Sequence, residues 1–368
     1  MKSRTFLILL VCVALLAAVA FFTLRSEERD THDRTLGQPV LADLPFDRID
    51  KIRIASSRER VELVKTLRGW GVAQKKGYPA DFAKISDLVE KLQKMKIGKR
   101  FSVDPEIRNR LALHPPGDAS TPEESVAVRL TLLDEENRTL ADLLIGNARS
   151  SETGYGGQYL MHFDQDTVFL ADQSLKFLET EPAEWIHRKA VDLDAGTIRS
   201  VALYRGNTAD PVYRLERQQG DTGFTLAAAA VGGTLEAGKV DRVTEALSPL
   251  RIEDVLPAED PGRDISFENA DRFEFRTEDG WRYTIELGPS FSRQEETYTY
   301  ARVEKSAPKN EDSKTVPQET TEETAAVNSA DDELGRWIYV ISNWKNEDFI
   351  RDPKQLVKTP DGDLGSES

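Results

Sequence analysis

Residues that commonly carry out chemistry are widely spaced in this sequence. Its four histidines, His32, His114, His162 and His187, show no metal-ligand spacing, and no HExxH motif or cysteine and histidine cluster accompanies them. A serine nucleophile would need a motif such as GxSxG, which the chain lacks. Acidic residues are too abundant to single out a catalytic pair. The sequence therefore predicts no catalytic centre, no cofactor site and no metal site.

Aromatic side chains are the remaining candidates for recognition. Contacts with a ligand or partner are expected from Trp70, Tyr155, Tyr159, Trp185 and Trp337. Tryptophans in strands more commonly pack into a core, and a carbohydrate platform would need several exposed on one face. The glycine-rich residues 154–157 precede no helix, so they do not predict a dinucleotide loop. They are expected to form a mobile loop before a strand.

An apolar run from Thr5 to Leu24 is long enough to cross a bilayer as one helix. Two basic residues precede it, which predicts a cytoplasmic N-terminus and an exported remainder. A cleaved signal peptide is the alternative, with 18–20 as the small-residue site, but the run continues beyond it. A lipoprotein modified at Cys12 fits less well, because a bulky valine precedes this cysteine.

Composition restricts the partners. A formal net charge of −15 disfavours nucleic acid and anionic lipid surfaces, and no basic patch stands out in the sequence. The single cysteine lies inside the apolar run, so the exported region holds no disulfide. These features are typical of a bacterial periplasmic domain stabilised by packing.

Short alternating runs predict strands before and after one helix in the first half. Apolar residues alternate at Ile49, Ile52 and Ile54, and later from Val126 to Leu132. Between these runs, Ile85–Met95 shows the spacing of three and four that buries one helical face, with Asp81 as a plausible N-cap. A second, short helix is expected to start at residues 174–178.

The second half repeats this order of elements. The residues of the opening strand recur 149 positions later as Ile198, Val201 and Leu203, and the helix recurs 155 positions later. The strand at Val128 is matched to Phe273, 145 positions later, and Ile145-Gly146 to Leu287-Gly288, 142 later. Several elements in one order, at nearly constant offsets, predict an internal duplication.

One stretch has no counterpart in the first half. Residues 305–335 are polar, acidic and nearly free of aromatic residues, and they replace a tight turn between two matched strands. We interpret them as a disordered insertion at a hairpin tip. The expected organisation is a cytoplasmic tip at 1–4, an anchor at 5–24, a tether at 25–43, repeat units at 44–192 and 193–358, and a flexible tail at 359–368.

The chain resembles the bacterial family known as domain of unknown function 4340. The resemblance rests on the apolar N-terminal run, the opening strand at 49–52, and the segments 67–72, 85–95, 111–116, 144–146, 158–160 and 185–193. It covers nearly the whole chain, although the junction at 185–188 matches loosely and the second half is more diverged. The family has no established catalytic residues. The resemblance implies an envelope protein, in some genomes encoded beside ABC-type export or gliding-motility components.

The expected fold is α+β: an N-terminal transmembrane helix, then two tandem homologous units, each an antiparallel sheet with one packed helix. The expected function is that of a non-enzymatic accessory or scaffold protein, anchored in the bacterial inner membrane, with its main region in the periplasm. Its partner would be an inner-membrane protein complex, such as an ABC-type exporter. Two alternatives stay open: a glycan- or lipid-binding module using the groove between the repeats, and an envelope hydrolase without a known motif.

Overall fold

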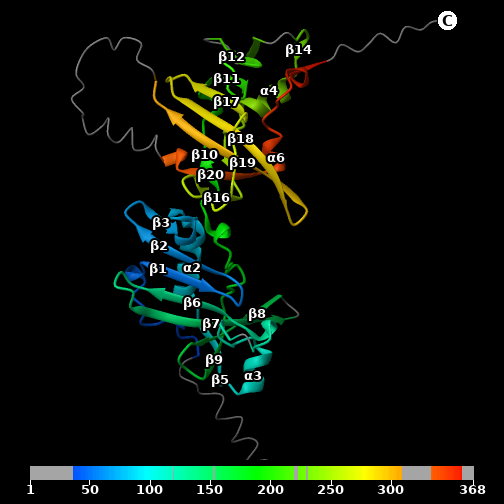
Figure 1. Ribbon diagram of the computed structural model, residues 1–368. Coiled ribbons are helices and arrows are strands. Elements are labelled where there is room, and N and C mark those ends of the chain that lie inside the picture. The colour runs from blue at the N-terminus through cyan, green and yellow to red at the C-terminus, as the bar shows by residue number, and fades with distance from the viewer. Residues whose placement is uncertain are drawn as a thin grey trace, which may run out of the picture. The chain divides into compact units, whose positions relative to one another are not determined.

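The computed structural model describes residues 36–118, 120–151, 154–218, 223–228, 231–308 and 333–358. These residues are mostly β-strand with few helices and divide into two compact units (Figure 1). Unit 1 comprises the chain up to Glu62 and Ala83–Thr180, and unit 2 comprises Leu63–Phe82 and the chain from Glu181. The predicted anchor, most of the tether and insertion, and the whole tail lie outside the described residues. Within the described residues, no helix is long and apolar enough to cross a membrane.

The first sheet has nine strands, which pair in antiparallel ladders. In spatial order the strands are β4 (Tyr78–Pro79), β3 (Gly69–Val72), β2 (Arg60–Thr66), β1 (Lys51–Ala55), β6 (Val128–Leu133), β7 (Thr139–Ser151), β8 (Gly154–His162), β9 (Thr167–Ala171) and β5 (Ile97–Ser102).

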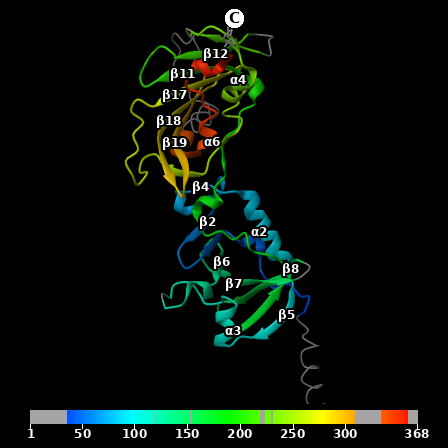
Figure 2. The same cartoon turned by 90° about the vertical axis from the view of Figure 1, so that its right-hand side faces the viewer.

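Helix α2 (Phe82–Lys94) lies against one face of this sheet (Figures 1 and 2). It buries Ile85, Leu88 and Leu92, as the spacing of three and four predicts. On the sheet, Ile52 and Ile54 are fully buried, opposite Leu132 and Leu130 of β6. Alternation along each strand sends the intervening polar residues to the other face.

The short helix expected at residues 174–178 is absent from the structure, so this prediction is wrong. These residues form bends and turns. The buried amide of Gln158 accepts the N–H of Leu175, and Leu175 and Leu178 are both buried. Two buried leucines three residues apart thus show the same spacing as one turn of a helix, although the chain here is not helical.

The other face of the sheet is covered over β7, β8 and β9 only. The chain between β5 and β6, which contains α3 (Pro105–Arg110), crosses these strands. A second apolar cluster forms there: Leu111, Leu113, Ala127, Leu144, Met161 and Val168. The covering chain comes so close to Gly146 that a Cβ on this residue would lie 2.2 Å from the carbonyl oxygen of Leu111.

The second sheet has eight strands. In spatial order they are β13 (Phe224–Ala227), β12 (Tyr213–Arg217), β11 (Ile198–Arg205), β17 (Asp271–Thr277), β18 (Arg282–Arg293), β19 (Glu296–Ser306), β20 (Trp337–Ser342) and β16 (Asp254–Pro257). Its helices are α4 (Ala237–Thr244), which contacts β11, and α6 (Asn343–Asn346), which contacts β19 and β20.

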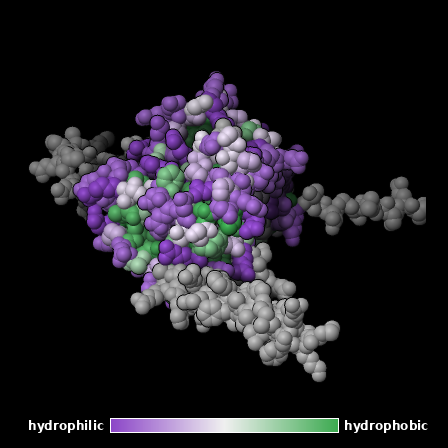
Figure 3. All heavy atoms as spheres, turned by 90° about the horizontal axis from the view of Figure 1, so that it is seen from below, coloured by the Kyte–Doolittle hydropathy of each residue, from purple (hydrophilic) through white to green (hydrophobic). Residues whose placement is uncertain are grey.

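Smaller elements complete the two units. Two short ladders pair β10 (Lys189–Val191) with β15 (Leu250–Arg251), and β14 (Thr234–Leu235) with β21 (Val357–Lys358). The 3₁₀ helices are Phe46–Arg48, Ala73–Lys75, Glu123–Ser125, Pro182–Trp185, Ala195–Thr197 and Pro353–Leu356. Seen from below, the surface is mainly hydrophilic, with smaller hydrophobic patches (Figure 3).

The two sheets share one strand order once β4 is set aside. The series β3-β2-β1-β6-β7-β8-β9-β5 corresponds to β13-β12-β11-β17-β18-β19-β20-β16. The registers agree as well: Ile145 faces Leu160, and their matched residues Leu287 and Ala301 face each other. The polar face of the second sheet is again half covered, by an apolar cluster of Tyr298, Tyr300, Ile338 and Val340 with residues of the 256–267 segment.

One predicted offset is wrong by two residues. Leu130 faces Ile54, and Phe273 faces Leu203, which is the counterpart of Ile54. Residue 130 therefore corresponds to 273, an offset of 143 and not 145. A shift by two keeps every side chain on its face, so the apolar pattern alone could not reveal it.

Candidate functional site

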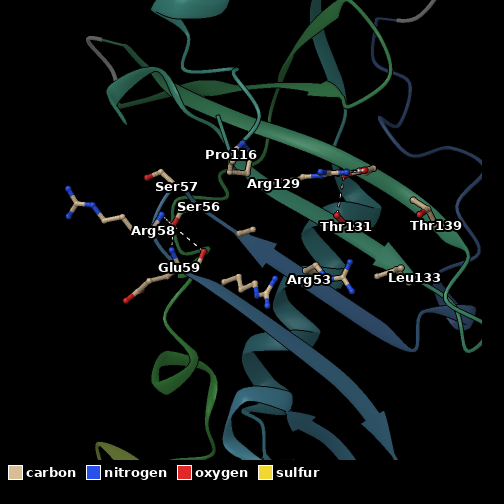
Figure 4. Close-up of a pocket in the computed structure, with 14 residues that line it drawn as sticks. Arg53, Ser56, Ser57, Arg58, Glu59, Pro116, Arg129, Thr131, Leu133 and Thr139 are labelled. Atoms are coloured by element: carbon tan, nitrogen blue, oxygen red, sulfur yellow. Dashed lines mark hydrogen bonds and ion pairs between the residues drawn. The ribbon is translucent and has the colours of Figure 1, made fainter. Parts of the chain in front are cut away.

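A polar cavity of about 470 Å³ lies on the uncovered part of the first sheet, where the covering loop ends. It lies within unit 1 and is lined by β1, the turn after it, β6, β7 and the loop at Pro116 (Figure 4). Its walls hold several arginines and two acidic residues, Glu59 and Asp142. The cavity is within the size range of small-ligand sites, but its lining is more charged than is usual for them.

An arginine and an aspartate on adjacent strands form the first ion pair of the site. The Nε and Nη2 of Arg129 donate to Oδ1 and Oδ2 of Asp142, at 2.9 and 2.6 Å. Thr131 donates to the same carboxylate at 3.1 Å, and the guanidinium lies 3.7 Å from the centre of the Phe163 ring. The hydrogen bond to Asp142 raises the pKa of Arg129, against the opposing effect of burial. This guanidinium is fixed in position and in charge.

A second ion pair stands beside it. The Nε and Nη2 of Arg53 donate to Oε2 of Glu62 at 2.9 and 2.7 Å, and Lys51 lies 3.6 Å from the same carboxylate. Burial alone would raise the pKa of Glu62, but hydrogen bonding and the charges of Arg53 and Lys51 lower it below its ordinary value. Glu62 therefore stays ionised at neutral pH.

A tight turn closes one side of the cavity. The backbone N–H of Ser56 donates to the carbonyl of Glu59 at 2.8 Å, and the Ser56 hydroxyl accepts from the N–H of Glu59 at 3.1 Å. Arg58 leaves this turn and pairs with Glu123, so its side chain points away from the sheet (Figure 4).

The geometry of the site suits binding better than proton transfer. A general acid or base works best when its pKa lies near the working pH. The pKa of Glu62 is lowered and that of Arg129 is raised, so both pKa values move away from neutral pH and both groups stay charged. Fixed charges on a sheet can instead recognise a polar partner by complementarity.

The aromatic residues proposed as contacts fall into both units. In unit 1, Tyr159 packs against the apolar cluster under the covering chain, and the backbone of Tyr155 pairs with Ser150. In unit 2, Trp185 is fully buried, Trp337 is 7% exposed and meets the Tyr78 ring at 5.1 Å, and Trp70 is half-buried. Trp185 thus has no exposed surface to offer a partner.

The glycine-rich residues 154–157 belong to strand β8, so the expectation of a loop is wrong. Gly157 has a φ of +122°, and a Cβ there would meet Leu170 of β9 at 2.6 Å. Close approach of the neighbouring strand therefore explains this glycine. Within the described residues, no group of His, Cys, Asp or Glu is arranged to hold a metal ion.

Sequence reasoning did not identify the charged pairs of the cavity. The available signal was the alternation of Lys51 and Arg53 with buried isoleucines, and of Arg129 with buried leucines. Alternation places these residues on the polar face, but their partners come from other strands and could not be found by spacing.

The fold and site define a protein of two sheet-based units with charged open faces. A family model described as Domain of unknown function (DUF4340) matches residues 70–269, more than half of the chain. The chain belongs to this family. No curated protein and no solved structure matches it.

Proposed function

We propose that this protein is a non-enzymatic accessory or scaffold protein of a bacterial envelope complex, with an ABC-type exporter as the first candidate partner. The apolar run from Thr5 to Leu24 would hold it in the inner membrane, with the N-terminus in the cytoplasm and the two units in the periplasm. The groups that carry the proposal are the fixed ion pairs on the open sheet of unit 1.

The supporting observation is that the polar face is covered over β7, β8 and β9 but open over β1 and β6. The side chain of Arg53 is 43% exposed and that of Arg129 is 32% exposed, although each is held to a carboxylate by two hydrogen bonds. An ordered and charged surface loses little side-chain entropy when a partner binds, and its charges select the partner.

Unit 2 also carries charged residues on the corresponding face of its sheet. A row of paired residues, Tyr204, Arg272, Glu286 and Arg302, crosses β11, β17, β18 and β19. Arg302 lies 3.5 Å from Glu286. We further propose that the units are homologous and arose by duplication; the common strand order supports this, and a failed superposition of the shared strands would contradict it.

Site-specific crosslinking tests the docking role. A photoreactive amino acid at Arg60, which lines the cavity, should capture a membrane protein in intact cells. The same amino acid at Glu90, on the exposed side of α2, should not. Arg129→Gln should weaken capture at position 60, because it breaks the bidentate pair with Asp142.

The outcomes separate the hypotheses. Capture of exporter subunits at position 60 supports an accessory role, whereas equal capture from both positions contradicts docking on the sheet. Recovery of glycan or lipid without protein would favour a ligand-binding module instead. Alkaline phosphatase fused to the C-terminus should be active only if the two units are exported, which tests the location separately.

A further inference from the structure

The open face of unit 2 carries a hollow rich in arginine, although the chain as a whole is strongly acidic. The hollow has a volume of about 760 Å³ and is lined by five arginines and two glutamates: Arg199, Arg214, Arg217, Arg276, Arg282, Glu216 and Glu278. The formal net charge of the chain is −15, so the sign of the charge is reversed locally. Such a reversal concentrates anions at one place on the surface.

Strand register brings the arginines together. Ser200 of β11 faces Arg276 of β17, and Arg276 faces Arg282 of β18. These residues therefore form one row across three adjacent strands, on the face opposite the buried Phe273 and Phe275. The side chain of Arg276 is 53% exposed.

An irregularity in β11 adds a further arginine. The register between β11 and β17 shifts between Ile198 and Ser200, so Arg199 is an extra residue in the strand. A bulge of this kind re-aims a side chain, and both Arg199 and Ser200 line the hollow. Among the described residues, no carboxylate pairs with Arg199.

The arginines of the row are only partly neutralised. Glu274 accepts from Arg276 at 2.7 Å and lies 3.8 Å from Arg282, so one carboxylate serves two guanidinium groups. Like charges directly opposite each other on a sheet are unfavourable. An added anion would relieve this repulsion.

Two other arginines have structural partners. Arg217 donates to the carbonyl of Gly196, and Arg214 lies 3.5 Å from Glu216. Arg276 and Arg282 share one carboxylate, and Arg199 pairs with none among the described residues, so these three groups keep positive charge that a ligand can neutralise. They come from three neighbouring strands. Three guanidinium groups match the three terminal oxygens of a phosphate monoester better than the two of a carboxylate.

We propose that this hollow binds the phosphate group of a phosphate-bearing ligand through Arg199, Arg276 and Arg282. Unit 1 has no such site at the equivalent place, because the counterpart of Arg276 is Leu133 and that of Ser200 is Lys51. The remaining volume would accommodate the group that bears the phosphate. The phosphate could belong to a soluble compound or to a lipid headgroup.

Calorimetric titration of the full chain in non-ionic detergent tests the proposal, with pyrophosphate, dioctanoyl phosphatidic acid, dioctanoyl phosphatidylcholine and hexaglutamate as probes. Pyrophosphate should bind, and its affinity should fall as salt rises. Arg276→Gln combined with Arg282→Gln should weaken binding by about tenfold or more, the effect of losing a charge-assisted hydrogen bond. Arg205→Gln is the matched control for a single substitution in the hollow, Arg199→Gln, since each removes one positive charge and Arg205 is exposed outside the hollow.

Arg199→Gln is a second variant that leaves the contacts of Glu274 intact, so its effect does not depend on the folding of the double variant. Tighter binding of the phosphatidic acid than of pyrophosphate would assign the phosphate to a lipid, and the reverse would assign it to a soluble compound. No binding of either phosphate probe would overturn the proposal. So would equal binding by the wild type and the Arg199→Gln variant, or hexaglutamate binding as tightly as pyrophosphate.

Discussion

Replacing Gly146 with alanine should destabilise unit 1 strongly. The added Cβ would lie 2.2 Å from the carbonyl oxygen of Leu111 and 2.8 Å from Cδ2 of Leu113, whereas ordinary contacts begin near 3.4 Å. The covering chain must therefore move by about 1.2 Å, the difference between the first and last of these distances. The carbonyl is backbone and cannot rotate away as a side chain could.

The movement has two costs. The carbonyl of Leu111 accepts the N–H of Asn147 at 2.8 Å, and losing such a hydrogen bond costs about 0.5–1.5 kcal/mol. Leu113, which belongs to the covering chain, is fully buried, and overpacking at such a site costs about 1–3 kcal/mol. Together these effects predict a loss of about 1.5–4.5 kcal/mol in the free energy of unfolding.

Gly288 and Gly238 provide matched controls. At Gly288, the counterpart of Gly146, the nearest atom to an added Cβ is Cε1 of the Phe267 ring at 2.9 Å, which can turn aside. Gly288→Ala should therefore cost only about 1 kcal/mol. Gly238 lies in α4, and no other atom lies within 4 Å of a Cβ added there. Gly238→Ala should therefore raise the free energy of unfolding by about 0.5–1 kcal/mol.

Urea unfolding followed by circular dichroism, at matched protein and detergent concentrations, measures these differences. A loss below about 1 kcal/mol for Gly146→Ala would refute the reasoning, because it would mean that the covering chain moves freely. An equal loss at Gly288 would also refute it, because the two sites differ in whether backbone or side chain blocks the Cβ.

Three further predictions concern charge and chain length. Burial alone would raise the pKa of Asp134, but hydrogen bonds from a neighbouring arginine lower it below the unfolded-state pKa of 3.8. The ionised carboxylate therefore stabilises the fold fully at pH values above 3.8, and this stabilisation is lost as the pH falls further. The melting temperature of Asp134→Asn should therefore lie below that of the wild type at neutral pH and approach it in acid; a constant gap would contradict this. The side chain of Lys345 is 6% exposed and donates to Asp348 at 3.0 Å. Lys345→Met should therefore lower the free energy of unfolding in urea by about 1–3 kcal/mol. Lys94→Met, at an exposed ion pair, should lower it by less than about 0.5 kcal/mol. Replacing residues 309–332 with a four-residue linker should leave the melting temperature unchanged or slightly higher. The strands β19 and β20 remain paired, and a shorter loop lowers the entropic cost of closure by about 1–2 kcal/mol. A fall of several degrees would show that the replaced segment is packed.

The sequence predicted features that depend on local periodicity. The buried face of α2 follows from Ile85, Leu88 and Leu92, whose spacing allows only one helical stripe. The correspondence between the strands of the two sheets was likewise found from a local pattern, the apolar alternation repeated at nearly constant offsets. Its one error, at β6, was a shift of two residues, to which a pattern of period two is insensitive.

Features that depend on distant residues were not predictable. The chain around α3 covers β7, β8 and β9 of the first sheet, but its irregular sequence gave no sign of which strands it crosses. The arginine hollow was missed because Arg199, Arg276 and Arg282 are far apart in the chain, and only the strand register brings them together. A search for basic runs cannot detect a patch assembled by pairing.

The two units are interleaved along the chain, and this has a consequence for synthesis. Leu63–Phe82 belongs to unit 2, yet it is made before most of unit 1. Tyr78 within it is 5% exposed and packs on Trp337, a residue translated much later. In a nascent chain, the Tyr78 ring thus lacks its Trp337 contact until the C-terminal strands arrive. A fragment ending at residue 180 would lack Trp337 permanently and leave the Tyr78 ring without this contact, so it should aggregate more readily than the whole chain.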